Sequence, residues 1–357
     1  MEPIQLLDLS REELQTLLAD WGEPGYRADQ IQGWLYQRYA ASPEEMTDLP
    51  RTLRARLAAE TSFNPLTPLV NLDSSDGQTH KTLFGLPAGE PGLGAGTQVE
   101  AVLMGYKKRR TLCISTQAGC AMGCPFCATG QGGFARNLTA GEIVAQVLYY
   151  ARMLTGQGQR VTNVVFMGMG EPLANYAATW AAIRRLNDPS SFGLGARAMT
   201  LSTVGLAPAM RRMIHEPEQV GLAVSLHAPT DELRDELVPV NRRYPLAQVM
   251  QVCRDYVRAT RRRISFEYAL MDGVNDRDEQ AGQLADLIQG MLVHVNLIPL
   301  NPTADSPYRG SPPERVRAFQ AVLEGRGIPT TLRMRRGIDI QAGCGQLRTR
   351  YWQGNGF

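Results

Sequence analysis

Three cysteines lie close together in the sequence, and their spacing indicates a metal centre. They are Cys120, Cys124 and Cys127, in the pattern C-x3-C-x2-C. Three thiolates can bind one centre but supply only three ligands, whereas a structural zinc site is closed by four. A [4Fe–4S] cluster bound by three cysteines leaves one iron open to a small molecule. We therefore interpret the motif as the site of one [4Fe–4S] cluster, with zinc as the alternative.

The elements that must position this motif form an alternating pattern from about residue 110 onward. Amphipathic helical stretches lie between most of the strand-like runs, which predicts a parallel α/β sheet, either open or curled into a barrel. Chemistry in such folds lies at the carboxyl ends of the strands, and the cysteines follow the first strand. The expected strands are Thr111–Ser115, Val161–Met167, Met199–Thr203, Gly221–Leu226, Ile264–Leu270, Val293–Ile298 and Thr330–Arg333.

Two smaller regions precede this alternation. Residues 1–62 are predicted to be short helices, with a capping box at Ser10-x-x-Glu13 and a helix over Ala28–Tyr39. They could form an RNA-docking accessory domain or only a packing module. Residues 63–105 are predicted to be an antiparallel leader with strands at Thr82–Leu86 and Val99–Met104. Glu100 lies in that leader, and its position in a strand by itself indicates a side chain that faces solvent.

Composition bounds the possible classes of protein. The 357 residues are 43% apolar and 20% charged, which excludes global disorder. No apolar run reaches the roughly 18 residues of a membrane span, so no membrane partner is expected. The N-terminus lacks the features of a secretory signal, which predicts a cytoplasmic protein. In the reducing cytosol, six cysteines favour metal ligands or catalytic groups over structural disulfides; Cys253 matches no motif and is interpreted as a core thiol.

Charge is distributed unevenly along the chain. Residues 1–100 contain 7 Lys and Arg against 15 Asp and Glu, although the whole chain has a net charge of +2. The remainder is therefore basic, and its Lys and Arg residues occur in clusters. One such cluster alone usually marks a solvated face, but several on one domain favour a partner that carries phosphates. The clusters are Lys107–Arg110, Arg211–Arg212, Arg242–Arg243, Arg261–Arg263 and Arg333–Arg336.

Several motifs together resemble a known family. The C-x3-C-x2-C motif is the signature of radical S-adenosylmethionine (SAM) enzymes, and the loop Phe166–Pro172, with the sequence FMGMGEP, resembles their GGE-type motif. With Cys113–Cys120, Ser225–Ala228, Asn296–Pro302 and Arg336–Leu347, the chain is similar to the RlmN/Cfr family of RNA adenine methyltransferases. The resemblance implies a partial (β/α)6 barrel over 106–338, preceded by the helical domain and the β leader. It also implies a C-terminal tail, 339–357, that carries Cys344.

The resemblance also assigns site residues. Cys120, Cys124 and Cys127 would bind the cluster, whose open iron would bind SAM. Cys344 would take a methyl group, Cys113 would resolve the linkage to RNA, and Glu100 would accept a proton. One SAM would methylate Cys344 and a second would yield a 5′-deoxyadenosyl radical, so two SAM molecules are expected per turnover. The residues expected to contact SAM are Gly170, Glu171, Ser202, Ser225, Leu226, His227 and Asn301.

The function implied by the resemblance is methylation of carbon 2 of adenine, in 23S rRNA and in tRNA beside the anticodon. Carbon 2 has no lone pair with which to attack SAM, which explains the need for a radical route. A flavodoxin or ferredoxin would supply electrons, and a monomer is expected. Two alternatives remain open from sequence: methylation of carbon 8 of the same rRNA adenine, as in the Cfr type, and a zinc-stabilised RNA-binding module without catalysis. The segment Gly132–Leu138 and the N-terminal residues favour the RlmN type.

Overall fold

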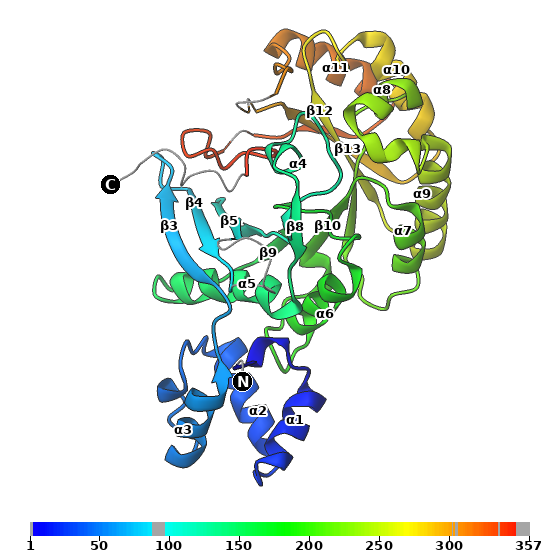
Figure 1. Cartoon of the computed structure of the whole chain (residues 1–357). Coiled ribbons are helices and arrows are strands. Elements are labelled where there is room, and N and C mark those ends of the chain that lie inside the picture. The colour runs from blue at the N-terminus through cyan, green and yellow to red at the C-terminus, as the bar shows by residue number, and fades with distance from the viewer. Residues whose placement is uncertain (1–2, 88–96, 302, 304–305, 335, 348–357) are drawn as a thin grey trace.

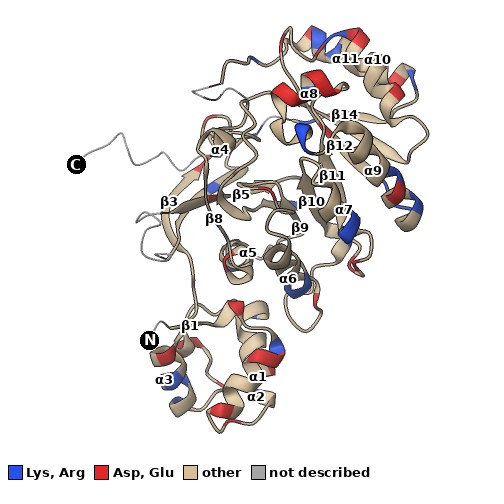
Figure 2. Cartoon of the chain, turned by 45° about the vertical axis from the view of Figure 1, so that its right-hand side comes forward, with Lys and Arg blue, Asp and Glu red and all other residues tan. Residues whose placement is uncertain are grey.

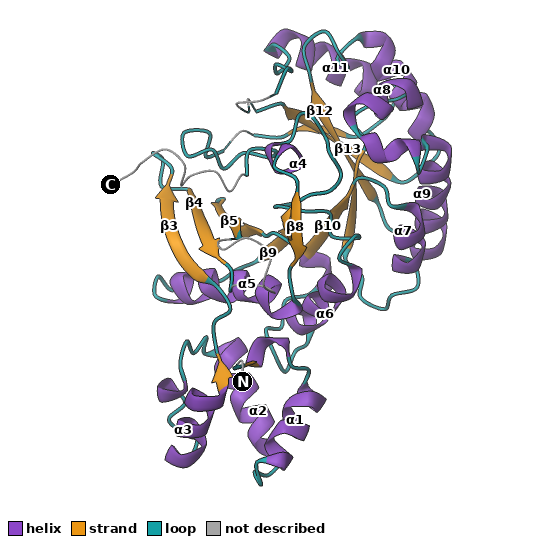
Figure 3. Ribbon diagram, viewed as in Figure 1, coloured by secondary structure: helices purple, strands orange, loops and turns teal. Residues whose placement is uncertain are grey.

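The fold was analysed in a computed structural model that describes residues 3–87, 97–301, 303, 306–334 and 336–347. Ten strands of the described chain form one curved sheet, in the order β14-β13-β12-β11-β10-β9-β6-β5-β4-β3. Seven neighbouring strands, β6 and β9–β14, are parallel, and β3–β5 continue the sheet as an antiparallel extension. The sheet has two free edges, β14 and β3, so the expected partial barrel is confirmed (Figures 1 and 3).

The parallel part is built from strands that agree with those expected from sequence. They are β6 (Arg110–Cys113), β9 (Asn163–Phe166), β10 (Met199–Thr203), β11 (Gly221–Ser225), β12 (Ile264–Leu270), β13 (Val293–Pro299) and β14 (Thr330–Leu332). Buried side chains dominate β6, β11 and β12. Buried and partly exposed residues alternate in β9, β10 and β13, and β14 has no buried residue.

Helices cover the outer, convex side of the parallel strands, as Figure 1 shows. The long helix after β6 begins at a capping box in which Thr139 accepts from the backbone N–H of Glu142. Residues 140–147 of this helix are all buried, and only its second half has a buried stripe at helical spacing, formed by Tyr150, Ala151 and Leu154. The helices are α4 (Ala128–Gln131), α5 (Ala140–Thr155), α6 (Tyr176–Asn187), α7 (Ala207–Met213), α8 (Asp231–Leu237), α9 (Leu246–Thr260), α10 (Asp278–Ile288) and α11 (Pro313–Gly325). Short 3-10 turns η4 (Ala196–Ala198) and η5 (Pro239–Arg242) complete this region.

The antiparallel extension contains β3 (Thr67–Asp73), β4 (Thr79–Gly85) and β5 (Gln98–Gly105). β4 and β5 were expected from sequence, but β3 was not, because its largely exposed residues give no alternation of buried and exposed side chains. A second, two-stranded sheet of β7 (Gln117–Gly119) and β8 (Phe134–Asn137) was also missed, because strands this short carry no readable period.

The N-terminal region is a separate layer of short helices beneath α5 and α6 (Figure 1). The capping box at Ser10 and Glu13 is present. The expected single helix over Ala28–Tyr39 is instead α2 followed by a π-helical turn, because helical spacing of apolar residues does not distinguish the two. The elements are β1 (Ile4–Gln5), η1 (Leu6–Asp8), α1 (Arg11–Asp20), α2 (Tyr26–Gln32), η2 (Gly33–Gln37), η3 (Pro43–Glu45), α3 (Arg51–Glu60) and β2 (Thr61–Ser62).

No helix within the described ranges has the length and apolar character needed to cross a membrane. The N-terminal region carries many acidic side chains, whereas Lys and Arg are prominent on α7 and near the end of α9 (Figure 2). Acidic side chains are also prominent on α8, so the two signs of charge are not confined to separate parts of the fold.

One buried arginine joins the loops at the carboxyl ends of β10 and β11. Arg234 is fully buried and donates hydrogen bonds to the carbonyl oxygens of Val204, Ser225 and Leu226 and to Oδ1 of Asn241. Burial lowers the pKa of Arg234 to about 10, so the guanidinium remains charged at neutral pH. The side chain therefore fixes the ends of two strands, where a ligand would bind.

We predict that Arg234→Met destabilises the protein by at least about 3 kcal/mol, because several buried acceptors lose their donor and each costs about 1–3 kcal/mol. The free energy of unfolding from denaturant titration measures this effect. Arg258→Met is the matched control, since the Arg258 side chain is 78% exposed on α9; we expect a change within about 0.5 kcal/mol. Equal losses in the two variants would contradict the assigned role of Arg234.

Candidate active site

The three cysteines of the motif lie on one loop between β7 and α4. Two backbone hydrogen bonds hold this loop. At its start, the Cys120 N–H donates to the carbonyl oxygen of Gly133 at 2.7 Å, and at its end, the Cys127 N–H donates to the carbonyl oxygen of Cys124 at 3.1 Å. Gly119 is required at the start, because its φ is +75° and a Cβ there would lie 2.0 Å from the Gly133 carbonyl oxygen.

The three thiols line a single cavity, and its donor set fits an iron–sulfur cluster. All are free of disulfides. Within the described part of the chain, no three His, Cys, Asp or Glu side chains converge closely enough to hold one metal ion. Three spread thiols suit a cluster, in which each thiolate binds a different iron, better than one tetrahedral zinc ion. Burial raises the pKa of Cys120 to about 12, so a bound cation would be needed to hold its thiolate.

A larger cavity of about 790 Å³ adjoins the cysteine loop at the carboxyl ends of the strands. Five of the residues expected to contact SAM line it, and they come from three different strand ends: Gly170, Glu171, Ser202, Ser225 and His227. The structure therefore brings these five together, although they are spread over 58 residues of sequence.

Gly170 and Glu171 fix the loop that follows β9. Gly170 has φ +97°, and a Cβ there would lie 2.5 Å from Cβ of Gln117, so no larger residue fits this close approach. The Glu171 carboxylate accepts from the backbone N–H groups of Leu173 and Val204. Burial raises the pKa of Glu171 to about 7, with these hydrogen bonds opposing the shift. Glu171 thus joins two loops while its carboxylate lines the cavity.

His227 is held as a neutral ring. Its backbone has φ +62°, and Nδ1 accepts from the Ala269 N–H at 3.0 Å. This hydrogen bond assigns the ring proton to Nε2. Burial lowers the pKa of His227 to about 3, and Phe126 packs edge-on against the ring at 4.9 Å. His227 can therefore donate one hydrogen bond to a ligand without carrying charge.

Two other expected SAM contacts lie elsewhere. Leu226 is fully buried in the hydrophobic core and does not line the cavity. Asn301 lines a neighbouring cavity and donates from Nδ2 to the carbonyl oxygen of Cys344 at 3.2 Å. The side chain of Asn301 thus contacts the C-terminal segment in this structure.

Cys344 lies where the two cavities meet. It lines the large cavity beside the cysteine loop, and it also lines the second cavity together with Cys113. Cys113 ends β6 and is buried, which raises its pKa to about 12. Both thiols are free, so the expected disulfide between them is absent from this structure. Cys253 is fully buried in α9, which confirms its interpretation as a core thiol.

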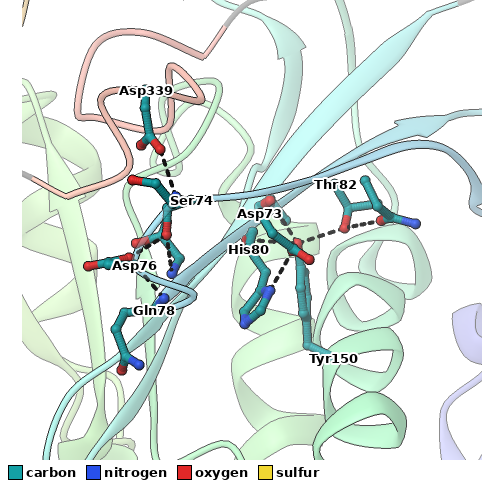
Figure 4. A network of polar contacts seen from close by, with 12 residues as sticks. Asp73, Ser74, Asp76, Gln78, His80, Thr82, Tyr150 and Asp339 are labelled. Atoms are coloured by element: carbon teal, nitrogen blue, oxygen red, sulfur yellow. Dashed lines mark hydrogen bonds and ion pairs between the residues drawn. The ribbon is translucent and has the colours of Figure 1, made fainter.

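Contacts from several elements hold the segment that carries Cys344. The carbonyl oxygens of Gly345 and Leu347 accept from the Ala128 N–H and the Thr129 hydroxyl, both in α4. At its other end, the Asp339 carboxylate accepts from the Ser75 N–H in the turn between β3 and β4 at 2.8 Å, as Figure 4 shows. The expected tail, residues 339–357, is described only as far as 347.

Glu100 is buried, and the expectation that it faces solvent is wrong. Its side chain is 1% exposed and forms an ion pair with Lys81 at 3.0 Å. Glu100 has the same orientation in β5 as Val102 and Met104, which line the cavity shared by Cys113 and Cys344. Lys81 also donates to the carbonyl oxygen of Gln341, three residues before Cys344. The C-terminal segment covers this face of the sheet, which local sequence does not reveal.

Sequence reasoning missed two charged residues in this region, Lys81 and Glu267, and it placed a third, Arg333, only in a basic cluster that favours a partner carrying phosphates. Glu267 and Arg333 line the large cavity, and their side chains are 3.8 Å apart. The negative charge of a Cys344 thiolate, and next that of Glu267, raises the pKa of Arg333 above its usual range. Of these residues, Glu267 could have been found from the sequence, because it is the one acidic residue in the expected strand Ile264–Leu270. A charge that is buried in such a strand requires a partner.

Comparison with known proteins agrees with this site. The Radical SAM superfamily model matches residues 114–285, which contain the cysteine loop and most of the large cavity. The model described as the ribosomal RNA large subunit methyltransferase N-terminal domain matches residues 4–62. Fold and site therefore define a radical SAM protein, in which a [4Fe–4S] cluster and SAM are the expected cofactors.

Full-length relatives narrow the assignment. A probable dual-specificity RNA methyltransferase RlmN from Chloroflexus aurantiacus is 50% identical and covers 98% of this chain and 94% of its own. One from Moorella thermoacetica is 50% identical over 97% of both chains. A crystal structure of a radical SAM methyltransferase from Sphaerobacter thermophilus is 51% identical, with a TM-score of 0.94 over 97% of this chain and all of that one. The chain belongs to the RlmN family of radical SAM RNA methyltransferases.

We predict that Lys81→Met destabilises the protein by about 3–5 kcal/mol, because it removes one partner of a buried ion pair. The double variant Lys81→Met/Glu100→Gln should recover a large part of this loss, since the carboxylate charge is then removed as well. Unfolding of the two single variants and the double variant gives the coupling energy. Additive losses would show that the pair is not coupled in the folded state.

Proposed function

We propose that this protein methylates carbon 2 of adenine in 23S rRNA and in tRNA next to the anticodon. The observation that carries the proposal is the position of Cys344 between two cavities. One cavity contains the residues expected to bind SAM, and the other contains Cys113. A thiol in this position can take a methyl group on one side and pass it to a base on the other.

The cofactors would be held by the residues already described. Cys120, Cys124 and Cys127 would bind one cluster, and Gly170, Glu171, Ser202, Ser225 and His227 would surround SAM. When bound, the cluster and SAM supply the methyl group and the one-electron chemistry that an unreactive amidine carbon requires. Each turnover would use two SAM molecules, because one donates the methyl group and another initiates the radical reaction.

The protein's own residues account for the remaining steps. The Cys344 thiolate accepts the methyl group, because sulfur is a good nucleophile toward SAM. After the methyl-derived carbon is joined to the base, the adduct would give up one electron, which the cluster would take up, and Glu100 accepts the proton of carbon 2. The Cys113 thiolate then attacks the Cys344 sulfur: an S–S bond forms, the bond between that sulfur and the carbon breaks, and the electron pair passes to the carbon, which takes a proton. The product is a methylated adenine and a Cys113–Cys344 disulfide that must be reduced.

RNA would reach the cavity that contains Cys113 and Cys344 from its basic edge. Tyr106 lines this cavity, and the guanidinium groups of Arg109 and Arg336 lie 5.2 and 4.4 Å from the centre of its ring. Cationic groups beside an aromatic ring suit a nucleic acid, which offers both phosphates and flat bases. The target base must leave its stack to reach the thiols.

We further propose that 1–62 docks RNA, that flavodoxin or ferredoxin supplies electrons, and that the protein acts as a cytoplasmic monomer.

Mass spectrometry of nucleosides from a deletion strain tests the proposed product. Complementation with this chain should restore 2-methyladenosine in both RNAs. Formation of 8-methyladenosine would instead show the alternative position, and absence of any methylated adenosine would overturn the proposal.

We predict that Cys124→Ala loses the iron and sulfide of the purified protein, because two thiolates cannot hold the cluster. Iron and sulfide per chain, measured after anaerobic purification, test this. Cys253→Ala is the matched control, since that thiol is also buried but lies in α9 and lines none of the three cavities; it should retain both elements. Normal iron in Cys124→Ala would contradict the cluster assignment.

We predict different failures for the two thiols at the second cavity. Cys344→Ala lacks the methyl acceptor, so it should form neither methylated cysteine nor RNA product. Cys113→Ala keeps the acceptor but cannot resolve the linkage, so a covalent complex of Cys344 with RNA should accumulate. A slow, nuclease-sensitive band on denaturing gels would reveal the complex. Full turnover by Cys113→Ala without the band would show that another group resolves it.

A further inference from the structure

Lysine is rare in this chain, and one lysine is buried. Only three of the 37 Lys and Arg residues are lysines, and two of them, Lys107 and Lys108, are exposed between β5 and β6. The third, Lys81 on β4, has a side chain that is 3% exposed. A lysine ammonium is compact and has three donors on a flexible stem, whereas the arginine guanidinium is a planar fork. Lysine at this position therefore suits a buried cation that must contact several groups at once.

Lys81 joins two segments that the proposed reaction requires in one place. Its Nζ lies 3.0 Å from Oε1 of Glu100 on β5, and it donates to the carbonyl oxygen of Gln341 at 3.2 Å. Register places Lys81 opposite Val102, on the face of the sheet that lines the cavity containing Cys344. Glu100 is the proposed base, and Gln341 precedes the proposed methyl acceptor, Cys344, by three residues. One ammonium thus contacts both the base and the segment of the acceptor.

The C-terminal segment follows β4 closely at this point. Gly337 has φ +57°, and a Cβ there would lie 2.8 Å from Cγ2 of Thr79 on β4. Gln341 has φ +52°, a backbone conformation that is uncommon for a residue with a side chain and that persists only where its surroundings enforce it. Lys81 binds the carbonyl oxygen of this same residue. The hydrogen bond therefore supports an unfavourable backbone conformation close to Cys344.

We propose that Lys81 is a positioning residue that holds the base Glu100 and the acceptor Cys344 in one arrangement, so that both reach the same adenine carbon. The inference rests on the proposed function, because that function assigns the roles of Glu100 and Cys344. In the covalent complex, carbon 2 is joined through the methyl-derived carbon to the Cys344 sulfur, and Glu100 must reach the proton on carbon 2. The two groups belong to β5 and to an irregular segment, so the sheet alone does not fix their relative position. Lys81 supplies the contact that they share.

Reactivity of the Cys344 thiol tests the first contact without requiring turnover. The cluster-containing protein is treated with a bulky maleimide, and the labelled cysteines are identified by mass spectrometry. In Lys81→Met, the segment should leave the cavity more often. Cys344 should then be labelled at least about tenfold faster, as expected for loss of a hydrogen bond from a charged donor. Cys253 is the internal control, because it is fully buried in α9 and its labelling would reveal global unfolding.

Release of the RNA tests the second contact. Protein that is already methylated at Cys344 is mixed with RNA, SAM and a reductant for one turnover, and denaturing gels follow formation and loss of the covalent complex. Lys81→Met should slow loss of the complex at least about tenfold relative to its formation, because Glu100 is misplaced. In a Glu100→Gln background, Lys81→Met should not slow release further but should still accelerate labelling of Cys344. A side chain that only stabilised the fold would not separate the two measurements in this way.

Thr82→Val is the matched control on the same strand. Thr82 is also buried, and its hydroxyl donates to Asn71 and accepts from Tyr150 (Figure 4). Its side chain is on the face of β4 opposite that of Lys81, because successive residues of a strand alternate. We expect this variant to lose stability but to keep both the labelling of Cys344 and the release of RNA within about twofold of the unmodified protein.

Iron content and melting temperature establish that each variant is folded. If Lys81→Met alone does not fold, Lys81→Met/Glu100→Gln, which removes both charges of the pair, is compared with Glu100→Gln by the labelling of Cys344. Unchanged labelling in a folded Lys81 variant would overturn the role of Lys81 and leave the proposed function intact. Faster labelling with a normal rate of release would also overturn it, since the base would then be placed without Lys81. Failure of the unmodified protein to methylate RNA would instead overturn the proposed function.

Discussion

The site depends on holding one thiol at the boundary between two cavities. Cys344 belongs to an irregular segment, so no helix or strand of its own fixes it. Its position comes from α4 on one side, from Asn301 on another and from the β3–β4 turn at a distance. Each of these partners is in turn fixed by the sheet or by the cysteine loop. The cluster loop and the methyl acceptor are therefore parts of one hydrogen-bonded unit.

Buried charge is a second constraint, and the protein meets it in several ways. Arg234 has four acceptors around one guanidinium, the Glu171 carboxylate accepts from two backbone N–H groups, and Lys81 pairs directly with Glu100. Unpaired charges in such positions would be strongly destabilising. Arg234 and Glu171 bind loops at strand ends, and Lys81 and Glu100 lie within β4 and β5. The interactions that stabilise the fold there therefore also set the electrostatic environment of the site.

Much of the fold and part of the site could be predicted from the sequence. The strands that were found are apolar runs that end at readable turns, and the cysteine spacing is itself a chemical signal. Glu100 was misjudged because residues 337–347, far away in sequence, cover its face of the sheet. Strand position gives the alternation of faces but not what covers each face. Glu267 was overlooked for a related reason, because strand periodicity does not show which polar side chain adjoins a cavity. Leu226 was included with Ser225 and His227, but alternation places it in the core.

The segment around Cys344 is held largely through its carbonyl oxygens. Those of Gln341, Cys344, Gly345 and Leu347 accept from Lys81, Asn301, Ala128 and Thr129 respectively. These hydrogen bonds depend on the path of the backbone and not on which side chains the segment carries. Substitutions of the Gln341 side chain can therefore be tolerated as long as the backbone path is kept. In contrast, rotation of one peptide plane is enough to break one of these hydrogen bonds. The segment can therefore move Cys344 out of its position by small local changes, without unfolding the sheet.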